Sequence, residues 1–202
     1  MKTLTVILYN IRSTYNVGAI LRTCDCLGVD SVIFTGYTPF IDKGLPHEQA
    51  KLRKQIHKTA LGAEDTMKWS RIEDIHEAIQ SVRKQNIPVY ALEQGAKSLN
   101  LSEPQEFPES LAVILGEEVK GIPLDILDKC DGLFEIPMCG QKESFNVSVA
   151  TGIILWEIRK SDLSGKEKYL RMQREFRQPW RLREFHQYNQ RCLPPTCRSR
   201  KV

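Results

Sequence analysis

The residues best placed to do chemistry lie in a polar loop, residues 139–144, and just after it. The loop follows an apolar segment that ends near Ile136 and precedes a long apolar segment that is predicted to be a helix. Loops at the carboxyl ends of strands are where an α/β domain presents its binding and catalytic groups. Ser144 and Asn146 offer hydrogen-bonding oxygens there, which suit either a polar ligand or the free backbone N–H groups of the first helical turn. A binding site and a helix cap are therefore both open hypotheses.

Positive charge near the end of the chain forms a second group of residues suited to binding. The 202 residues carry a formal net charge of +4, but eleven Lys or Arg and three Glu lie in residues 166–202. That stretch therefore carries +8 and the remainder −4. A basic arm suits a polyanion such as RNA, although a solvated tail explains the charge as well. A smaller basic patch consists of Lys51, Arg53, Lys54, His57 and Lys58.

The elements that must position these groups follow from the spacing of apolar residues. Strands are predicted at residues 4–9, 31–35, 67–71, 89–93, 111–115 and 133–136. Helices are predicted at residues 17–27, 72–85, 124–127 and 148–160. Residues 36–64 have few clean periods and are predicted to be loop. Strands that alternate with helices predict an α/β fold with a mostly parallel sheet.

Several classes of protein are excluded by what the sequence lacks. It has no run of eighteen apolar residues and no signal-peptide pattern, so we expect a cytoplasmic protein with no membrane partner. The scattered cysteines are expected to be reduced thiols. Cys192 and Cys197 lack the second pair and the spacing of a zinc site, so no metal is predicted. The turn after the first strand has no GxGxxG pattern, which argues against an ordinary nucleotide-binding domain.

Three segments together resemble the motifs of a known enzyme family. They are Asn16-Val-Gly-Ala-Ile-Leu-Arg-Thr23, Leu115-Gly-Glu-Glu-Val-Lys-Gly121 and Ile136-Pro-Met-Cys-Gly-Gln-Lys-Glu-Ser-Phe-Asn-Val-Ser-Val-Ala150. In order and spacing they closely resemble the three motifs of the SpoU (TrmH-like) branch of the SPOUT RNA methyltransferases. The resemblance covers about residues 3–160.

This resemblance implies a SPOUT-type α/β fold, with a parallel sheet flanked by helices and a C-terminal deep trefoil knot, an exception to the rule against knots. It implies that residues 1–160 form the SpoU methyltransferase catalytic domain, followed by a basic C-terminal extension at residues 161–202. It also implies S-adenosylmethionine as the cofactor, a homodimer, and methyl transfer to a ribose 2′-hydroxyl of tRNA or rRNA.

The resemblance carries over onto this sequence residue by residue. The catalytic residues it implies are Asn16 and Arg22 of the first motif, Glu118 of the second, and Ser144 and Asn146 of the third. The residues it implies for the cofactor pocket are Leu92, Glu93, Gly116, Ile136, Met138, Ser144, Phe145 and Asn146. Phe145 stands where Leu is commoner, which we expect to alter packing rather than chemistry. Asn16 is also placed like a helix N-cap.

Arg22 has two possible roles. A ribose hydroxyl is a poor nucleophile near neutral pH, so its attack on a methyl group needs a proton acceptor or strong orientation. An arginine guanidinium stays protonated in ordinary surroundings, which favours a grip on a phosphate beside the target nucleotide. The resemblance alternatively makes Arg22 the base itself.

The leading hypothesis is therefore an S-adenosylmethionine-dependent RNA 2′-O-methyltransferase, with tRNA favoured over rRNA as the substrate. A catalytically inactive knotted RNA-binding protein is the alternative from another class, and the intact set of motif residues argues against it. The chain begins at the first core strand, so target selection is expected to use the core surface, a dimer groove or the C-terminal extension.

Overall fold

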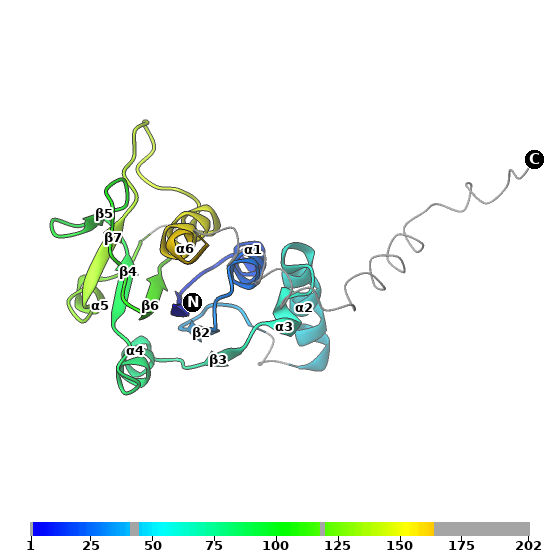
Figure 1. Ribbon diagram of the computed structural model, residues 1–202. Coiled ribbons are helices and arrows are strands. Elements are labelled where there is room, and N and C mark those ends of the chain that lie inside the picture. Colours follow the sequence, from blue (N-terminus) through cyan, green and yellow to red (C-terminus); the bar gives the residue numbers. More distant parts are fainter. Residues whose placement is uncertain (1, 41–44, 118–119, 164–202) are drawn as a thin grey trace, which may run out of the picture. The chain divides into compact units, whose positions relative to one another are not determined.

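Seven parallel strands form one sheet in the order β3-β2-β1-β6-β4-β7-β5 (Figure 1). The computed structural model describes residues 2–40, 45–117 and 120–163. The strands are β1 (Thr3–Tyr9), β2 (Ser31–Thr35), β3 (Trp69–Arg71), β4 (Val89–Leu92), β5 (Leu99–Asn100), β6 (Ser110–Leu115) and β7 (Gly132–Glu135). The predicted α/β fold with a parallel sheet is therefore confirmed, and the two-residue β5 is an addition to the predicted strands.

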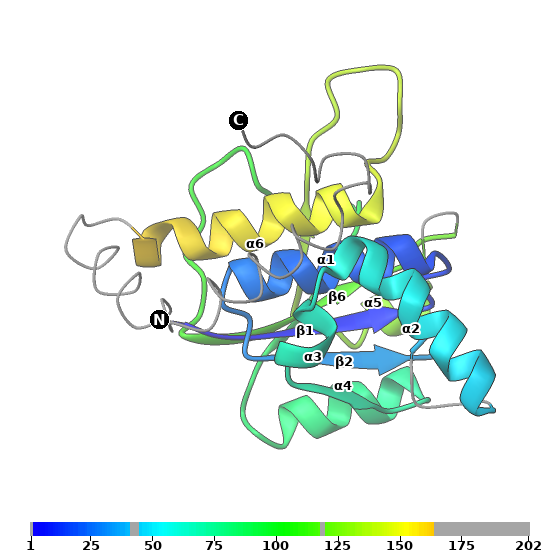
Figure 2. The ribbon, with the colours of Figure 1, turned by 90° about the vertical axis from the view of Figure 1, so that its right-hand side faces the viewer.

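Helices cover both faces of this sheet (Figures 1 and 2). They are α1 (Thr14–Cys26), α2 (Pro46–Ala60), α3 (Ala63–Thr66), α4 (Ile75–Arg83), α5 (Leu124–Leu127) and α6 (Val147–Leu163). Buried side chains of α1 and α6 join Val6 and Leu8 in one apolar cluster, whereas those of α4 and α5 join Ile7 in another. Neighbouring residues of β1 thus point to opposite faces, and both faces are buried, which explains the unbroken apolar run in its sequence.

Helix α1 begins three residues earlier than the predicted start at residue 17. Its N-cap is Ser13, whose hydroxyl accepts a hydrogen bond from the backbone N–H of Asn16 at 3.3 Å. The prediction that Asn16 is placed like an N-cap was therefore wrong, because Asn16 lies inside the first turn. Its side chain is not used to cap α1.

The prediction of a loop over residues 36–64 was also wrong, because the fifteen-residue α2 lies within it. Two start signals were present in the sequence. Pro46 occupies the first helical turn, and the Glu48 carboxylate reaches back to accept from the backbone N–H of Leu45 at 2.9 Å. The apolar stripe was too thin to reveal the helix, since Ile56 and Ala60 are its buried residues.

Helix α2 crosses α1 at Gly18 with a very close approach. A Cβ atom on Gly18 would lie 2.2 Å from Oγ1 of Thr59 and 2.4 Å from the carbonyl oxygen of Ile56. The Thr59 hydroxyl also donates to the Tyr15 carbonyl oxygen at 2.9 Å. A glycine is required at this crossing because no side chain fits between the two helices.

A buried arginine fixes the far end of α6. Arg159 is 1% exposed, and its guanidinium donates to the carbonyl oxygens of Leu27 at 3.0 Å, Gly28 at 2.6 Å and Lys2. These carbonyls lie just before β1 and β2, so α6 is attached to the amino-terminal edge of the sheet. The buried charge is satisfied by several backbone acceptors, as burial of a cation requires.

Candidate active site

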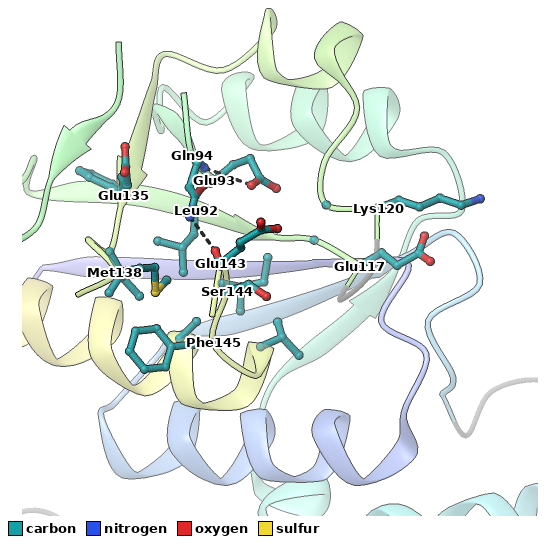
Figure 3. A pocket seen from close by; sticks show the side chains of 17 residues that line it. Leu92, Glu93, Gln94, Glu117, Lys120, Glu135, Met138, Glu143, Ser144 and Phe145 are labelled. Carbon is teal, nitrogen blue, oxygen red and sulfur yellow. Dashed lines mark hydrogen bonds between the residues drawn. The ribbon is translucent and has the colours of Figure 1, made fainter. Parts of the chain in front are cut away.

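A pocket of about 340 Å³ opens at the carboxyl ends of β4, β6 and β7 (Figure 3). Its walls include residues that follow these three strands, at 93–94, 116–117, 120–121, 136, 138 and 143–145, and residues 147 and 150 of the first turn of α6. Open parallel sheets bind their ligands at this edge, and the volume lies within the range of small-molecule sites. The pocket is therefore the candidate active site.

Most residues that were predicted to form a cofactor pocket line this one. Those in the lining are Leu92, Glu93, Gly116, Ile136, Met138, Ser144 and Phe145. Asn146 was predicted with them but is not in the lining. The structure thus brings the end of β4 together with the second and third motifs. What these residues bind stays a prediction.

Glu93 and Gln94 connect the loops on the two sides of the pocket (Figure 3). The Glu93 carboxylate accepts from the backbone N–H of Ile122 at 3.0 Å and from that of Gln94 at 3.1 Å. The Gln94 side-chain amide donates to the Glu143 carbonyl oxygen at 2.8 Å. Two adjacent residues at the end of β4 therefore hold the second-motif loop and the third-motif loop at a set separation.

Gly121 allows the second-motif loop to approach Glu93. Its φ is +66°, which side chains other than glycine rarely adopt, and a Cβ there would lie 2.4 Å from Oε2 of Glu93. Its backbone N–H donates to the Glu117 carbonyl oxygen at 3.0 Å. The glycine spacing in the second motif therefore has a steric reason.

Ser144 and Asn146 have different surroundings. The Asn146 side-chain oxygen accepts from the backbone N–H of Ser148 at 3.0 Å and from its hydroxyl at 2.6 Å, which is the geometry of an N-cap. Ser144 lines the pocket, and no described residue forms a hydrogen bond with its hydroxyl. The cap hypothesis thus holds for Asn146, while the site hypothesis fits the position of Ser144.

The first and third motifs meet in one hydrogen bond. The Asn146 amide nitrogen donates to the Asn16 side-chain oxygen at 3.2 Å, although the two residues are 130 positions apart in sequence. The start of α1 and the start of α6 are therefore adjacent, as Figure 2 also shows for the two helices. Asn16 is placed at the edge of the third motif rather than in the pocket lining.

Arg22 and Glu118 are the predicted catalytic residues that the structure does not place in the pocket. Arg22 is exposed on α1, outside the lining, and has no hydrogen-bond or ion-pair partner in the described part of the chain. Glu118 lies outside the described residues. The roles of both therefore stay predictions.

Sequence reasoning missed some polar residues of the pocket, among them Gln94, Lys120 and Glu143. Each is a close sequence neighbour of a predicted residue, and that adjacency was the available signal. It could not show that Gln94 contacts the third motif, because this contact joins segments 49 residues apart.

Tyr9 is a titratable group at the same edge of the sheet. Burial raises its pKa above the ordinary value, and the carboxylates of Asp125 and Glu117 raise it further. The phenol therefore stays protonated at neutral pH and supplies no base there.

The described part of the chain offers neither a metal centre nor a membrane-spanning helix. Residues 2–40, 45–117 and 120–163 contain no group of His, Cys, Asp or Glu suited to holding a metal ion. The same residues include no helix long and apolar enough to cross a membrane. Cys192 and Cys197, considered above for zinc, lie outside the described residues.

Comparison with known proteins relates this arrangement to a family. Residues 3–156 match the family model described as the SpoU rRNA Methylase family. The chain belongs to the SpoU family. It is 33% identical over 167 residues to a tRNA (guanosine(18)-2′-O)-methyltransferase of Thermus thermophilus. This match covers 80% of the chain and 77% of the Thermus enzyme. It is 30% identical over 165 residues to the 23S rRNA (guanosine-2′-O-)-methyltransferase RlmB of Xanthomonas axonopodis, covering 81% of this chain but 61% of RlmB.

Solved structures of RNA-modifying enzymes share the fold. An rRNA methyltransferase from Sinorhizobium meliloti with AdoMet bound superposes with a TM-score of 0.70 at 24% identity, over 81% of this chain and 59% of that one. A TrmH/SpoU tRNA modifying enzyme of A. aeolicus gives a TM-score of 0.66 at 22% identity, over 87% of each chain. At these identities the likeness supports the fold alone.

Proposed function

We propose that this chain transfers a methyl group from S-adenosylmethionine to a ribose 2′-hydroxyl of RNA. One observation carries the proposal: the second and third SpoU motifs, which are far apart in sequence, enclose one pocket at the carboxyl edge of the sheet. The curated relatives described above are named as enzymes of this reaction, on tRNA or on rRNA.

The side chains around the pocket fit S-adenosylmethionine. Leu92, Ile136 and Met138 provide apolar surface for a flat purine ring. The carboxylates of Glu117 and Glu143 in the lining suit a ligand that carries positive charge on sulfur and nitrogen. The pocket thus combines an apolar wall with acidic groups, as a sulfonium-bearing nucleoside requires.

S-adenosylmethionine, when bound, supplies a methyl group on a positively charged sulfur, which a ribose oxygen can accept. The chain must then orient that oxygen, since correct placement lowers the barrier strongly. The hydroxyl of Ser144, which has no hydrogen-bond partner among the described residues, is proposed to contact ribose or cofactor. Asn146 is engaged with Asn16 and Ser148, so we assign it a positioning role that fixes the loop carrying Ser144.

Arg22 is proposed to hold a phosphate beside the target nucleotide. Its side chain is exposed and unpaired within the described ranges, which suits an anionic ligand. The second candidate role is that of the base, which the family resemblance favours. Glu118 of the second motif is proposed to be a catalytic residue, as the family resemblance implies.

A homodimer is proposed because Arg22 does not line the pocket of its own chain. The outer face of α6 carries Val149 and Trp156, which are 49% and 52% exposed and lie two turns apart. An apolar helix face of this kind is suited to packing against a second copy. The Arg22 of one subunit would then serve the pocket of the other.

The remaining expectations belong to the same proposal. The trefoil knot would be formed around the second-motif and third-motif loops, which already face each other across the pocket. Residues 1–160 would be the catalytic domain, residues 161–202 the basic extension, and the cytoplasm the compartment. The tRNA substrate is favoured because the match spans 77% of the Thermus tRNA enzyme but less than two-thirds of RlmB.

The test combines cofactor binding with methyl transfer. Calorimetry with S-adenosylmethionine and incorporation of its labelled methyl group into tRNA or 23S rRNA transcripts are both expected to be positive. The methylated linkage should resist alkaline hydrolysis, because its 2′-oxygen is blocked. Cofactor binding without incorporation into either RNA would instead support the inactive RNA-binding alternative, and a methyl group on a base would refute ribose methylation.

A further inference from the structure

We infer that a basic strip on the body of the protein binds the phosphate backbone of the substrate RNA. The basic strip consists of Lys51, Lys54 and Lys58 of α2 and of Tyr15 and Arg22 of α1. The inference rests on the proposed function and adds the surface that the RNA takes. It concerns the described core and is independent of the extension at residues 161–202.

The three lysines share one face of α2. They occupy positions i, i+3 and i+7, and each is exposed. At 1.5 Å of rise per residue they span roughly 10 Å along the helix. A row of ammonium groups at this spacing suits contacts with successive phosphates of one strand.

No acidic side chain neutralises this row within the described part of the chain. The nearby carboxylates have other partners. Glu48, three residues before Lys51, accepts from the Leu45 N–H at 2.9 Å, Asp65 pairs with Arg53, and Glu64 contacts Nδ1 of His57 at 2.5 Å. Like charges three or four residues apart destabilise a helix, so the row works against the folding of α2. A bound polyanion would relieve this repulsion.

The row continues onto α1 through an aromatic ring. The Lys58 ammonium lies 5.7 Å from the ring centroid of Tyr15 and 3.5 Å from its hydroxyl. Tyr15, Gly18 and Arg22 lie on one side of α1, and Gly18 marks where α2 crosses. Arg22 therefore extends the strip past the crossing, and the half-exposed Tyr15 ring offers a base a surface on which to stack.

The chemistry of the strip favours RNA over a membrane surface. A helix that lies in a membrane needs an exposed apolar face opposite its charges. The buried residues of α2, Ile56 and Ala60, instead belong to the apolar cluster that contains α1. The strip also ends at Arg22, the residue proposed to hold a phosphate beside the target nucleotide.

The test replaces the charges of the strip and leaves Arg22 intact. In the full chain, Lys51→Gln, Lys54→Gln and Lys58→Gln are combined, and affinity for a fluorescent tRNA transcript is measured across salt concentrations. The matched control combines Lys84→Gln, Lys97→Gln and Lys129→Gln, which remove the same charge from exposed positions outside α1 and α2. Calorimetry with S-adenosylmethionine and thermal melting show whether each variant is folded.

The strip variant is expected to bind the transcript more weakly. The slope of log affinity against log salt concentration should become shallower by about 2 to 3, near one unit for each lost phosphate contact. The control should keep the wild-type slope, and both variants should bind the cofactor normally. Equal losses in the two variants, or an unchanged slope in the strip variant, overturn the inference. Binding to vesicles of anionic lipid is measured as well. A strip variant that loses vesicle binding but keeps its RNA affinity also overturns the inference. If the wild-type chain methylates RNA and the strip variant binds RNA with the same affinity and salt dependence, the inference about the strip is refuted. The proposed function is then unaffected.

Discussion

Ser144 and Asn146 are two positions apart in one polar loop, yet they do different work. The Asn146 side chain forms hydrogen bonds with the first turn of α6 and with Asn16, so it connects the third motif to the first. Ser144 keeps its hydroxyl in the pocket with no described partner. The cap hypothesis therefore holds for Asn146, and the proposed role of Ser144 in the site stays a prediction.

The first residue-scale prediction concerns Glu93. Replacing Glu93→Ala removes the acceptor of the Ile122 N–H, so the second-motif loop loses its attachment to β4. A hydrogen bond to a charged group is worth about 1.5 to 3 kcal/mol, so affinity for S-adenosylmethionine should fall roughly tenfold to a hundredfold. Glu93→Gln keeps an acceptor oxygen and should retain most of the affinity. Calorimetry that finds all three proteins equal would show that this contact does not shape the pocket.

The second residue-scale prediction concerns thiol reactivity. Burial raises the pKa of Cys130 to about 11 and that of Cys24 still further, whereas Cys26 and Cys139 are exposed. A raised pKa leaves little thiolate at pH 8, and the thiolate is the reactive form. Among the four cysteines that the structure describes, brief alkylation with iodoacetamide followed by peptide mass spectrometry should therefore modify Cys26 and Cys139 before Cys24 and Cys130. Early modification of Cys24 in the folded protein would contradict the described packing of α1.

Individual site residues were predictable where they are adjacent in sequence. The third motif has its pocket residues Met138, Ser144 and Phe145 within one loop, and the structure places all three in the lining. Arg22 differs because it is exposed and outside the pocket of its own chain. A motif identifies such a residue, but it does not show which group the side chain contacts.

Among the elements, the pair of α1 and α2 shows how one small residue controls packing. Gly18 permits close backbone contact where the two helices cross, and the Thr59 hydroxyl of α2 donates a hydrogen bond to the Tyr15 carbonyl oxygen of α1 there. The same crossing sets the basic strip beside Arg22. An error in this packing should therefore affect both stability and RNA contact.

The element-scale prediction is that Gly18→Ala destabilises the fold. The added methyl group would meet the backbone of Ile56 and the hydroxyl of Thr59, and overpacking of this kind costs about 1 to 3 kcal/mol. The control is Gly140→Ala, because nothing lies within 4 Å of a Cβ at Gly140, and it should change stability by less than about 0.5 kcal/mol. Urea unfolding measures both. A Gly18→Ala protein as stable as the control would mean that the crossing is looser than described.

Strands were easier to predict than the second helix, for a physical reason. The strands of a parallel sheet are buried on both faces, so β1, β2 and β6 appear as unbroken apolar runs. Helix α2 buries little and exposes charge on most of its surface, which removes the periodic signal on which prediction depends. The order of strands in the sheet was not predictable from spacing at all, because it depends on contacts between distant segments.

For the whole molecule, charge is divided between the core and the extension. Residues 166–202 carry +8 while the remainder carries −4, so any RNA contact on the core must use local patches such as the basic strip. Residues 164–202 of the extension lie outside the described residues, and the role of the extension stays a prediction. The two surfaces should contribute separately to RNA binding.

The whole-molecule prediction for the extension is a loss of electrostatic binding. Deleting residues 166–202 should weaken RNA binding and flatten its salt dependence, because cations that displace counterions are removed. Affinity for S-adenosylmethionine should stay unchanged, since the pocket is built from residues 92–150. Titration of labelled tRNA at several salt concentrations measures the effect. An unchanged RNA affinity would assign the extension a structural role.

The central claim is that Arg22 and the Ser144 loop serve one reaction centre from two subunits. Chains carrying Arg22→Ala or Ser144→Ala should each be nearly inactive alone. If the site is shared, one of the two sites in a heterodimer combines the intact Arg22 of one chain with the intact Ser144 of the other. The heterodimer, isolated with two affinity tags, should therefore regain up to about half of wild-type activity. The measurement is methyl incorporation into tRNA by that purified heterodimer. Restored activity is the predicted result, and a heterodimer as inactive as its parents would contradict the account.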